Sequence, residues 1–240
     1  YLVAPEQTTL DHTTILHSLG NDFQENKMSK HLRGRKNVAF AFFENEIRDQ
    51  AAIERVKFWD QLLVESSWNR DVCLDLVISN GAFVSQGVDT KQFYLGPKQG
   101  APTGRFVIYS GGKLEHRKGQ DLVLAAFKIF NKLHPNSLLI TAWQNSWIES
   151  ALTIKQSKYI DVAPVMNEHV SIGMTEWAIN NGVPADSFVD LGWVSNARLP
   201  EILRESDVAL FPSRREGGTN LVAMEAMASG TPCILSQNTG

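Results

Sequence analysis

The stretch "SGGKLEHRKGQD" (110–121) combines glycines and cations where an apolar run gives way to a helix-like run. Glycines at such a turn allow close backbone approach or a positive φ. A helix N-terminus with free amides suits a phosphate group, and added cations would hold a doubly charged group such as a diphosphate. The residues of this stretch that could do that chemistry are Gly111, Gly112, Lys113, Arg117 and Lys118.

A second stretch of the same kind is "SRREGGTN" (213–220), which also lies between an apolar run and a helix-like run. Arg214 or Arg215 would oppose the dipole of a helix that begins near Asn220 by about 0.3–1 kcal/mol. A bound anion would remove this conflict, and Gly217 and Gly218 would let the backbone reach it. Solvated arginines are the alternative, but two such turns in one half of the chain favour an anion site.

Neither turn matches a known nucleotide fingerprint, because G-x-G-x-x-G is absent and "GGKLEHRKG" lacks the ending of a Walker A loop. Glu225 is a further candidate for ligand binding, because it lies in a helix-like run of alanines, methionines and leucine where partial burial of its carboxylate is expected. A buried carboxylate without a partner is costly, so sugar hydroxyls are one partner that would suit it. A surface glutamate on the polar side of the helix is the alternative.

Composition and charge limit the classes of function. The 240 residues are 43% hydrophobic and 20% charged, which is ordinary for a globular protein. A formal net charge of −3 gives no basic field for nucleic acid. Cys73 and Cys233 lie too far apart to suggest a metal motif or a disulfide framework. The chain opens at Tyr1 and ends at Gly240 after a strand-like run, so we expect both ends to be cut.

The elements that must position these residues alternate between short apolar runs and amphipathic runs, as in a parallel sheet with crossover helices. In the first part of the chain, the expected strands are 37–43, 60–66 and 82–87, and the expected helices are 46–59 and 67–77. The loop-like stretch 87–104 holds four glycines and two prolines, so residues 89–104 are predicted to link two domains.

The alternation is clearer in the second part. The expected strands are 105–111, 137–143, 188–193, 207–213 and 231–236, and the expected helices are 120–134, 175–182, 198–206 and 220–229. The helix at 120–134 carries a stripe that an amphipathic helix turns toward the core, made of Leu122, Ala126, Ile129, Phe130 and Leu133. Two α/β halves with parallel sheets follow, and ligands of such sheets bind at the carboxyl ends of the strands.

These motifs resemble those of the retaining, nucleotide-sugar-dependent glycosyltransferases with the GT-B fold, the large group often called family 4 or group 1. The resemblance is carried by "GGKLEHRKGQDLVLAAFKIFNKLHPNSLLI" and "VALFPSRREGGTNLVAMEAMASGTPCI", with "LLVESSWNRDVCLD" and "QGVDTKQF" ahead of them in the right order. It covers roughly residues 37–240. It implies an incomplete N-terminal acceptor-side Rossmann-like domain at 1–88 and a truncated donor-binding Rossmann-like domain at 105–240.

The resemblance also implies roles for single residues. Lys118 and Lys113 would contact the donor diphosphate, Glu225 would bind the ribose, and Glu216 would lie near the donor sugar as the other acid of the motif. Eight residues separate Glu216 from Glu225, one more than is usual in the family. By the same resemblance, the donor site also includes Gly111, Gly112, Arg117, Val194 near the nucleobase, Gly217, Gly218, and the amides around Thr219, Asn220 and Leu221.

The implied activity is transfer of a sugar from a UDP- or GDP-sugar to a carbohydrate, glycolipid or small-molecule acceptor with retention of configuration. It requires no obligatory metal or cofactor. The resemblance implies a cytoplasmic location and allows peripheral association with the inner face of the membrane. Two other functions stay open: another GT-B enzyme, such as a phosphorylase or an epimerase, and a non-catalytic module that binds nucleotide sugars.

Overall fold

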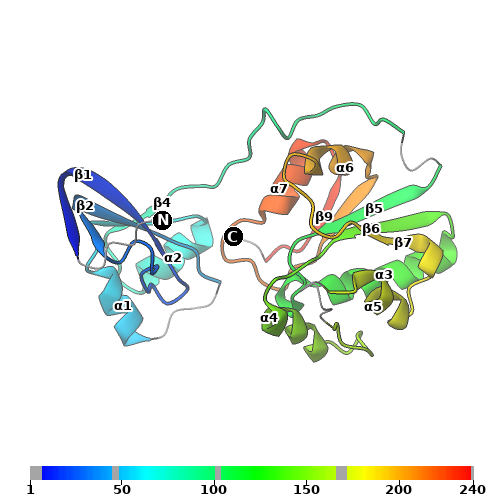
Figure 1. Ribbon diagram of the computed structural model, residues 1–240, viewed down its shortest axis with the longest axis horizontal. Helices are drawn as coiled ribbons and strands as arrows, with labels where there is room; N and C mark the ends of the chain where they lie inside the picture. The colour runs from blue at the N-terminus through cyan, green and yellow to red at the C-terminus, as the bar shows by residue number, and fades with distance from the viewer. Residues whose placement is uncertain (1–6, 45–48, 101–103, 166–171, 239–240) are drawn as a thin grey trace. The chain divides into compact units, whose positions relative to one another are not determined.

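The computed structural model describes residues 7–44, 49–100, 104–165 and 172–238. Contacts within the chain divide it into two compact units, whose elements Figure 1 colours in chain order. The first unit contains the described residues up to Gly87 and the segment Glu216–Thr219, and the second contains Val88–Arg215 and Asn220–Asn238. No helix among the described residues is long and apolar enough to cross a membrane.

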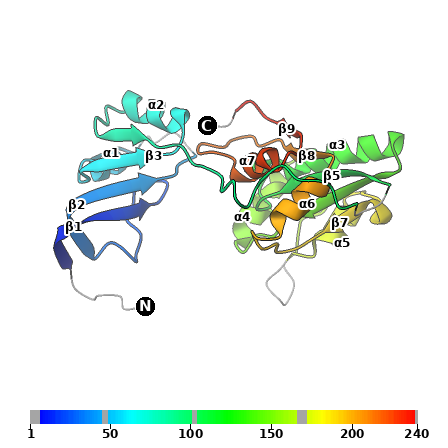
Figure 2. The same ribbon diagram turned by 90° about the horizontal axis from the view of Figure 1, so that it is seen from above.

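The first unit is built on a parallel sheet with strand order β1-β2-β3-β4, seen from another side in Figure 2. Its strands are β1 (Thr8–Leu19), β2 (Leu32–Ala41), β3 (Gln61–Val64) and β4 (Gly81–Phe83), and its helices are α1 (Gln50–Val56) and α2 (Ser67–Asp75). The three expected strands and both helices are present, although residues 46–48 of the first expected helix lie outside the described residues. Strand β1 was not predicted.

The second unit is a five-stranded parallel sheet with strand order β7-β6-β5-β8-β9. Its strands are β5 (Phe106–Gly111), β6 (Ser137–Ala142), β7 (Phe188–Asp190), β8 (Val208–Phe211) and β9 (Cys233–Leu235). Its α-helices are α3 (Gln120–Leu133), α4 (Ile148–Leu152), α5 (Met174–Asn180), α6 (Leu199–Glu205) and α7 (Leu221–Ala228), and its 3₁₀ helices are η1 (His116–Lys118), η2 (Thr153–Gln156) and η3 (Ala185–Ser187). The expected α/β class with parallel sheets is confirmed.

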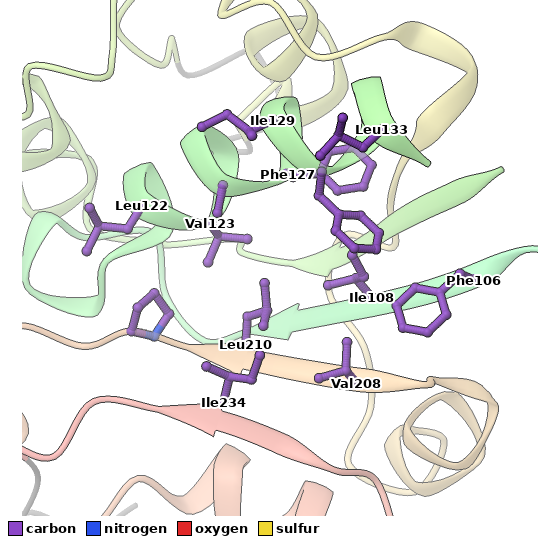
Figure 3. Close-up of a pocket in the computed structure, with 13 residues that line it drawn as sticks. Phe106, Ile108, Leu122, Val123, Phe127, Ile129, Leu133, Val208, Leu210 and Ile234 are labelled. Atoms are coloured by element: carbon purple, nitrogen blue, oxygen red, sulfur yellow. The ribbon is translucent and has the colours of Figure 1, made fainter. Parts of the chain in front are cut away.

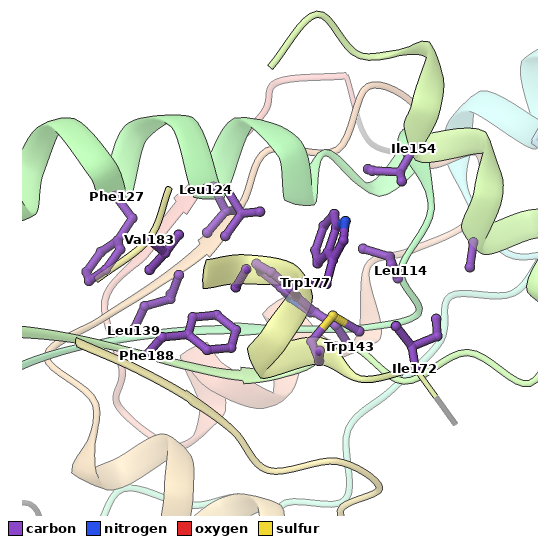
Figure 4. Close-up of a cluster of buried hydrophobic side chains, with 14 of the residues drawn as sticks. Leu114, Leu124, Phe127, Leu139, Trp143, Ile154, Ile172, Trp177, Val183 and Phe188 are labelled. Carbon is purple, nitrogen blue, oxygen red and sulfur yellow. The ribbon is translucent and has the colours of Figure 1, made fainter. Parts of the chain in front are cut away.

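One core of the second unit lies between its sheet and the helices α3 and α5 (Figure 4). Trp143, at the end of β6, is fully buried, and its indole N–H donates to Ser110 Oγ at 3.2 Å. Trp177 of α5 and Phe188 of β7 pack against the same indole. This core supports the carboxyl end of β5, which the first glycine- and cation-rich turn follows, whereas the second turn follows β8.

Helix α3 has two apolar faces, and only one of them is covered. Val123, Leu124 and Phe127 are buried in the core. The predicted core stripe instead borders an open groove of about 690 Å³ between α3 and the strands β5, β8 and β9 (Figure 3). Within it, Ile129 is 67% and Leu133 is 72% exposed. The predicted stripe is therefore only partly in the core: Phe130 packs against the buried cluster, whereas Ile129 and Leu133 border the groove.

Candidate functional site

The two turns follow neighbouring strands at the point where the sheet order of the second unit reverses. The chain moves from β5 to β6 on one side and later returns to β8 on the other side of β5. Ile108 pairs with Val208 and Tyr109 with Ala209, so both strands end at the same edge. In open α/β sheets, this switch point at the carboxyl ends is where ligands bind.

The first turn is held in a conformation that requires its glycines. Gly112 has φ of 102° and Gly119 has φ of 77°, which side-chain-bearing residues rarely adopt. Gln120, 1% exposed, supports the loop from inside: its Nε2 donates to Lys113 O at 2.7 Å, and its Oε1 accepts from Glu115 N at 3.2 Å. Sequence reasoning missed Gln120, although a polar residue at the start of an amphipathic helix is a recognisable signal.

The second turn packs directly on the first. A Cβ at Gly119 would lie 2.1 Å from Pro212 O, so only glycine allows this approach. Arg214 N donates to Arg117 O at 2.7 Å, and Arg117 Nη1 donates to Arg215 O at 2.9 Å. The two turns therefore form one structure, with Gly119 at their contact.

A pocket of about 20 Å³ opens where the turns meet. Gly111, Gly112 and Lys118 of the first turn line it together with Asn220 and Val222 at the start of α7. The structure thus brings together one predicted cation, two predicted glycines and one predicted helix N-terminus. The remaining lining residues are Ser110, Leu210, Phe211 and Ser213.

Helix α7 begins one residue after the predicted position. Asn220 is its N-cap, and the side-chain oxygen of Asn220 accepts from Ala223 N at 3.2 Å. The first amides of a helix have no carbonyl partner within the helix. The first amides of α7 belong to Leu221 and Val222, of which Val222 lines the pocket, and amides at the positive end of a helix dipole can donate to an anion.

Arg214 differs from the expectation that an anion neutralises it. Its Nη1 and Nη2 donate to the two carboxylate oxygens of Asp121 at 2.7 and 2.6 Å, and Nη1 also donates to His116 O at 2.6 Å. Asp121 is fully buried. Burial acts to raise the pKa of Asp121, but the hydrogen bonds from Arg214 and Ser157 outweigh it and the pKa is lowered. Arg214 is therefore neutralised by a carboxylate at the start of α3, and its charge does not require a bound anion.

The other two cations of the first turn have aromatic and acidic partners. Lys113 Nζ lies 4.7 Å from the centre of the Trp147 ring. Arg117 contacts Glu115, with Nη2 3.3 Å from Oε2. Neither Lys113 nor Arg117 lines the pocket of about 20 Å³. Their roles in donor binding stay predictions.

Glu225 is half-buried on α7, as the apolar run around it predicted. Burial raises the pKa of its carboxyl group, and a hydrogen bond from Asn196 opposes the rise. Val194 is half-buried in the loop that follows β7. The structure does not place either residue in the pocket lined by Lys118, and their roles with ribose and base stay predictions.

Four predicted residues, Glu216–Thr219, group with the first unit, and none of them lines the pocket of the second. A Cβ at Gly217 would lie 2.2 Å from Phe43 O, and Ser66 Oγ donates to Gly217 O. Gly217 is therefore needed for packing. Glu216 is 5% exposed, and the Thr219 hydroxyl donates to Gln86 Oε1.

Residues 105–240 match the profile of the family described as glycosyl transferases group 1. The match covers more than half of the chain. The chain belongs to this family. In line with this membership, 136 residues are 28% identical to mannosylfructose-phosphate synthase of Agrobacterium fabrum (strain C58 / ATCC 33970), covering 56% of this chain and 26% of that protein.

Solved structures of this fold class resemble the chain as well. The Anabaena protein HepE, solved with UDP and glucose, superposes with a TM-score of 0.62 at 14% identity, over 85% of this chain and 54% of its own. Sucrose-phosphate synthase from Thermosynechococcus elongatus gives a TM-score of 0.62 at 19% identity, over 85% of this chain and 51% of its own. These likenesses show the GT-B fold, and the chain spans about half the length of these structures.

Proposed function

We propose that this group 1 glycosyltransferase binds a nucleotide-sugar donor through its second unit and transfers the sugar to an acceptor with retention of configuration. The observation that carries the proposal is the pocket at the switch point. There, Lys118 and two glycines of the first turn meet the N-terminus of α7. This combination of an ammonium, bare backbone and helix amides suits a phosphate oxygen of the diphosphate of such a donor.

The chemistry needs stabilisation of the leaving group. When the bond between the anomeric carbon and the phosphate oxygen breaks, negative charge builds on the departing nucleoside diphosphate. Lys118, Lys113 and the amides of Leu221 and Val222 are the donors that stabilise this charge electrostatically. Because hydrogen bonds join the two turns, their backbone needs little rearrangement as the charge develops.

The donor is a UDP- or GDP-sugar in this proposal. HepE has been solved with UDP and with UDP-glucose, which supports a uridine nucleotide as the first candidate. Glu225 binds the ribose hydroxyls and Val194 lies near the base. The half-buried state of Glu225 supports this, because burial removes part of the hydration of its carboxyl group, as the raised pKa indicates, and hydroxyl donors can replace it.

The acceptor is a carbohydrate. Among similar proteins, the names mannosylfructose-phosphate synthase and sucrose-phosphate synthase describe formation of phosphorylated disaccharides. A sugar or sugar phosphate is therefore the first acceptor class to test, ahead of a glycolipid. A cytoplasmic location, with or without contact to the inner membrane face, stays a prediction of this proposal.

The test is a thermal-shift screen of the full-length protein against UDP-, GDP- and ADP-sugars. A ligand at 100 times its Kd stabilises the fold by about 2.7 kcal/mol, which is readily seen as a higher melting temperature. We expect stabilisation by one nucleotide series, and its loss in Lys118→Ala. Lys155→Ala, which changes an exposed lysine outside the pocket, is the matched control. If no nucleotide sugar stabilises the wild-type protein, the proposal is wrong.

A further inference from the structure

Trp147 is a large aromatic residue that the fold leaves 59% exposed, although it lies beside the turn that follows β5. It directly precedes the short helix α4 and is its N-cap residue, but its side chain makes no capping hydrogen bond. The Trp147 ring faces the ammonium group of Lys113, whose Nζ lies 4.7 Å from the ring centre. The contact therefore joins an exposed indole to a cation of the turn that follows β5.

The backbone that carries this indole is held by buried polar contacts. Asn145 is fully buried, and its Oδ1 accepts from Trp147 N at 2.9 Å. The Asn145 Nδ2 donates to Leu114 O, also at 2.9 Å. One buried side chain thus connects the backbone of Trp147 to the residue next to Lys113.

The backbone of Lys113 is equally fixed. Gln120 Nε2 donates to its carbonyl, and Leu114 N donates to Trp143 O at 2.9 Å. The preceding residue, Gly112, lines the pocket. These contacts leave the side-chain rotamer of Lys113 undetermined, and the Trp147 ring restricts the rotamers that it can adopt.

We propose that Trp147 is a positioning residue that holds Lys113 ready for the diphosphate of the donor. This inference rests on the proposed function. A free lysine loses considerable rotamer freedom when it binds an anion. The ring contacts one side of the ammonium group, which has three N–H donors, and leaves the others for phosphate oxygens. Part of the ordering therefore precedes donor binding.

The magnitude of the effect follows from the exposure of the contact. Cation–π contacts at exposed sites correspond to about a two- to fivefold change in affinity. Charge-assisted bonds to a diphosphate are stronger, so the donor keeps Lys113 even without the ring. We expect Trp147→Leu to weaken UDP binding about two- to fivefold, while Trp147→Phe, which keeps a ring face, stays nearer to wild type.

The experiment is a double-mutant cycle on the full-length protein, with UDP affinity measured by calorimetry and the unfolding midpoint measured in parallel. If Trp147 acts through Lys113, Trp147→Leu has its effect in the wild-type background and none in the Lys113→Ala background. A packing role would instead give the same loss in both backgrounds. Tyr94→Leu removes another aromatic partner of a cation, Arg204 at 5.0 Å, and should leave UDP affinity unchanged.

Each other outcome is decisive. Tighter UDP binding by Trp147→Leu would mean that the ring withholds Lys113 from the diphosphate, and equal losses in both backgrounds would mean that it only packs; either result overturns the positioning role alone. A wild-type protein that binds neither UDP nor GDP overturns the proposed function and this inference together.

Discussion

The turns that follow β5 and β8 both combine glycines with cations, but their cations have different partners. In the turn after β5, Lys118 lines the pocket at the sheet edge. In the turn after β8, Arg214 points back to the buried Asp121 at the start of α3 and is 32% exposed. A cation ahead of a helix is therefore not by itself an anion ligand. The turn after β5 supplies charge to the pocket, whereas the charge of Arg214 fixes the turn after β8 in place.

The largest expected effect tests the Lys118 side of this comparison. Loss of one donor to a developing oxyanion typically lowers the rate by about 10²–10³-fold. We expect Lys118→Ala to lower kcat for sugar transfer by that factor, with an unchanged unfolding midpoint. A rate within a few-fold of wild type would remove Lys118 from the mechanism. Lys155→Ala is the control for loss of a lysine outside the pocket.

Because Arg214 is paired with the buried Asp121, its loss is expected to lower stability. Removing one partner of a buried ion pair typically costs about 3–5 kcal/mol, and we expect the lower end because Arg214 is partly exposed. Arg214→Met should therefore lower the free energy of unfolding by about 3 kcal/mol, measured by urea denaturation. Arg214→Met combined with Asp121→Leu removes both charges and should recover much of that loss. A stable Arg214→Met variant with weak UDP binding would reverse the assignment.

The sequence predicted the two turns but not the difference between their cations. Strand–turn–helix alternation predicted both turns, the two helices that follow them and the parallel sheets, because apolar runs and glycine punctuation are local signals. The partner of Arg214 was not visible, because Asp121 lies 93 residues away. A local pattern cannot tell whether a turn cation faces a ligand or a distant carboxylate.

Two other misses have physical causes. Strand β1 carries the polar-rich sequence "TTLDHTTILHSL", which lacks the continuous apolar run of a buried parallel strand. Helix α3 has more apolar positions than its core can cover, so periodicity selected the stripe with Ile129 and Leu133, which borders the groove. Amphipathicity predicted the helix but not which apolar face the sheet would take.

Two buried carboxylates, Asp121 and Glu65, also differ in their partners: Asp121 has a charged partner, whereas Glu65 has none in the part of the chain that the structure describes. The effect expected from this difference is smaller. Asp121 is paired, but neither oxygen of Glu65, 1% exposed, has a hydrogen-bond partner among the described residues. Burial raises the pKa of Glu65 from 4.5 to about 7, although the Gln86 amide is near enough to oppose the rise. Below pH 4.5 the carboxyl is protonated in both states, and above about pH 7 the fold must bury a carboxylate. Its burial therefore lowers stability progressively as pH rises from about 4.5 to about 7.

Glu65→Gln should remove this pH dependence. We expect its melting temperature to equal that of the wild type near pH 4.5 and to exceed it at pH 8, in a series of calorimetric scans. Glu54→Gln, at an exposed glutamate hydrogen-bonded to Lys57, is the matched control and should not gain stability with pH. A lower melting temperature for Glu65→Gln at pH 8 would show that Glu65 has a stabilising partner.

The central claim is that the two turns build one diphosphate site in which Lys118 binds the anion and Arg214 does not. A crystal structure of the full-length protein with UDP tests it most directly. The claim predicts phosphate oxygens within about 2.7–3.2 Å of Lys118 Nζ and of the first amides of α7, with Arg214 still bonded to Asp121. A diphosphate bound away from this pocket, or an Arg214 that leaves Asp121 to bind it, would contradict the claim.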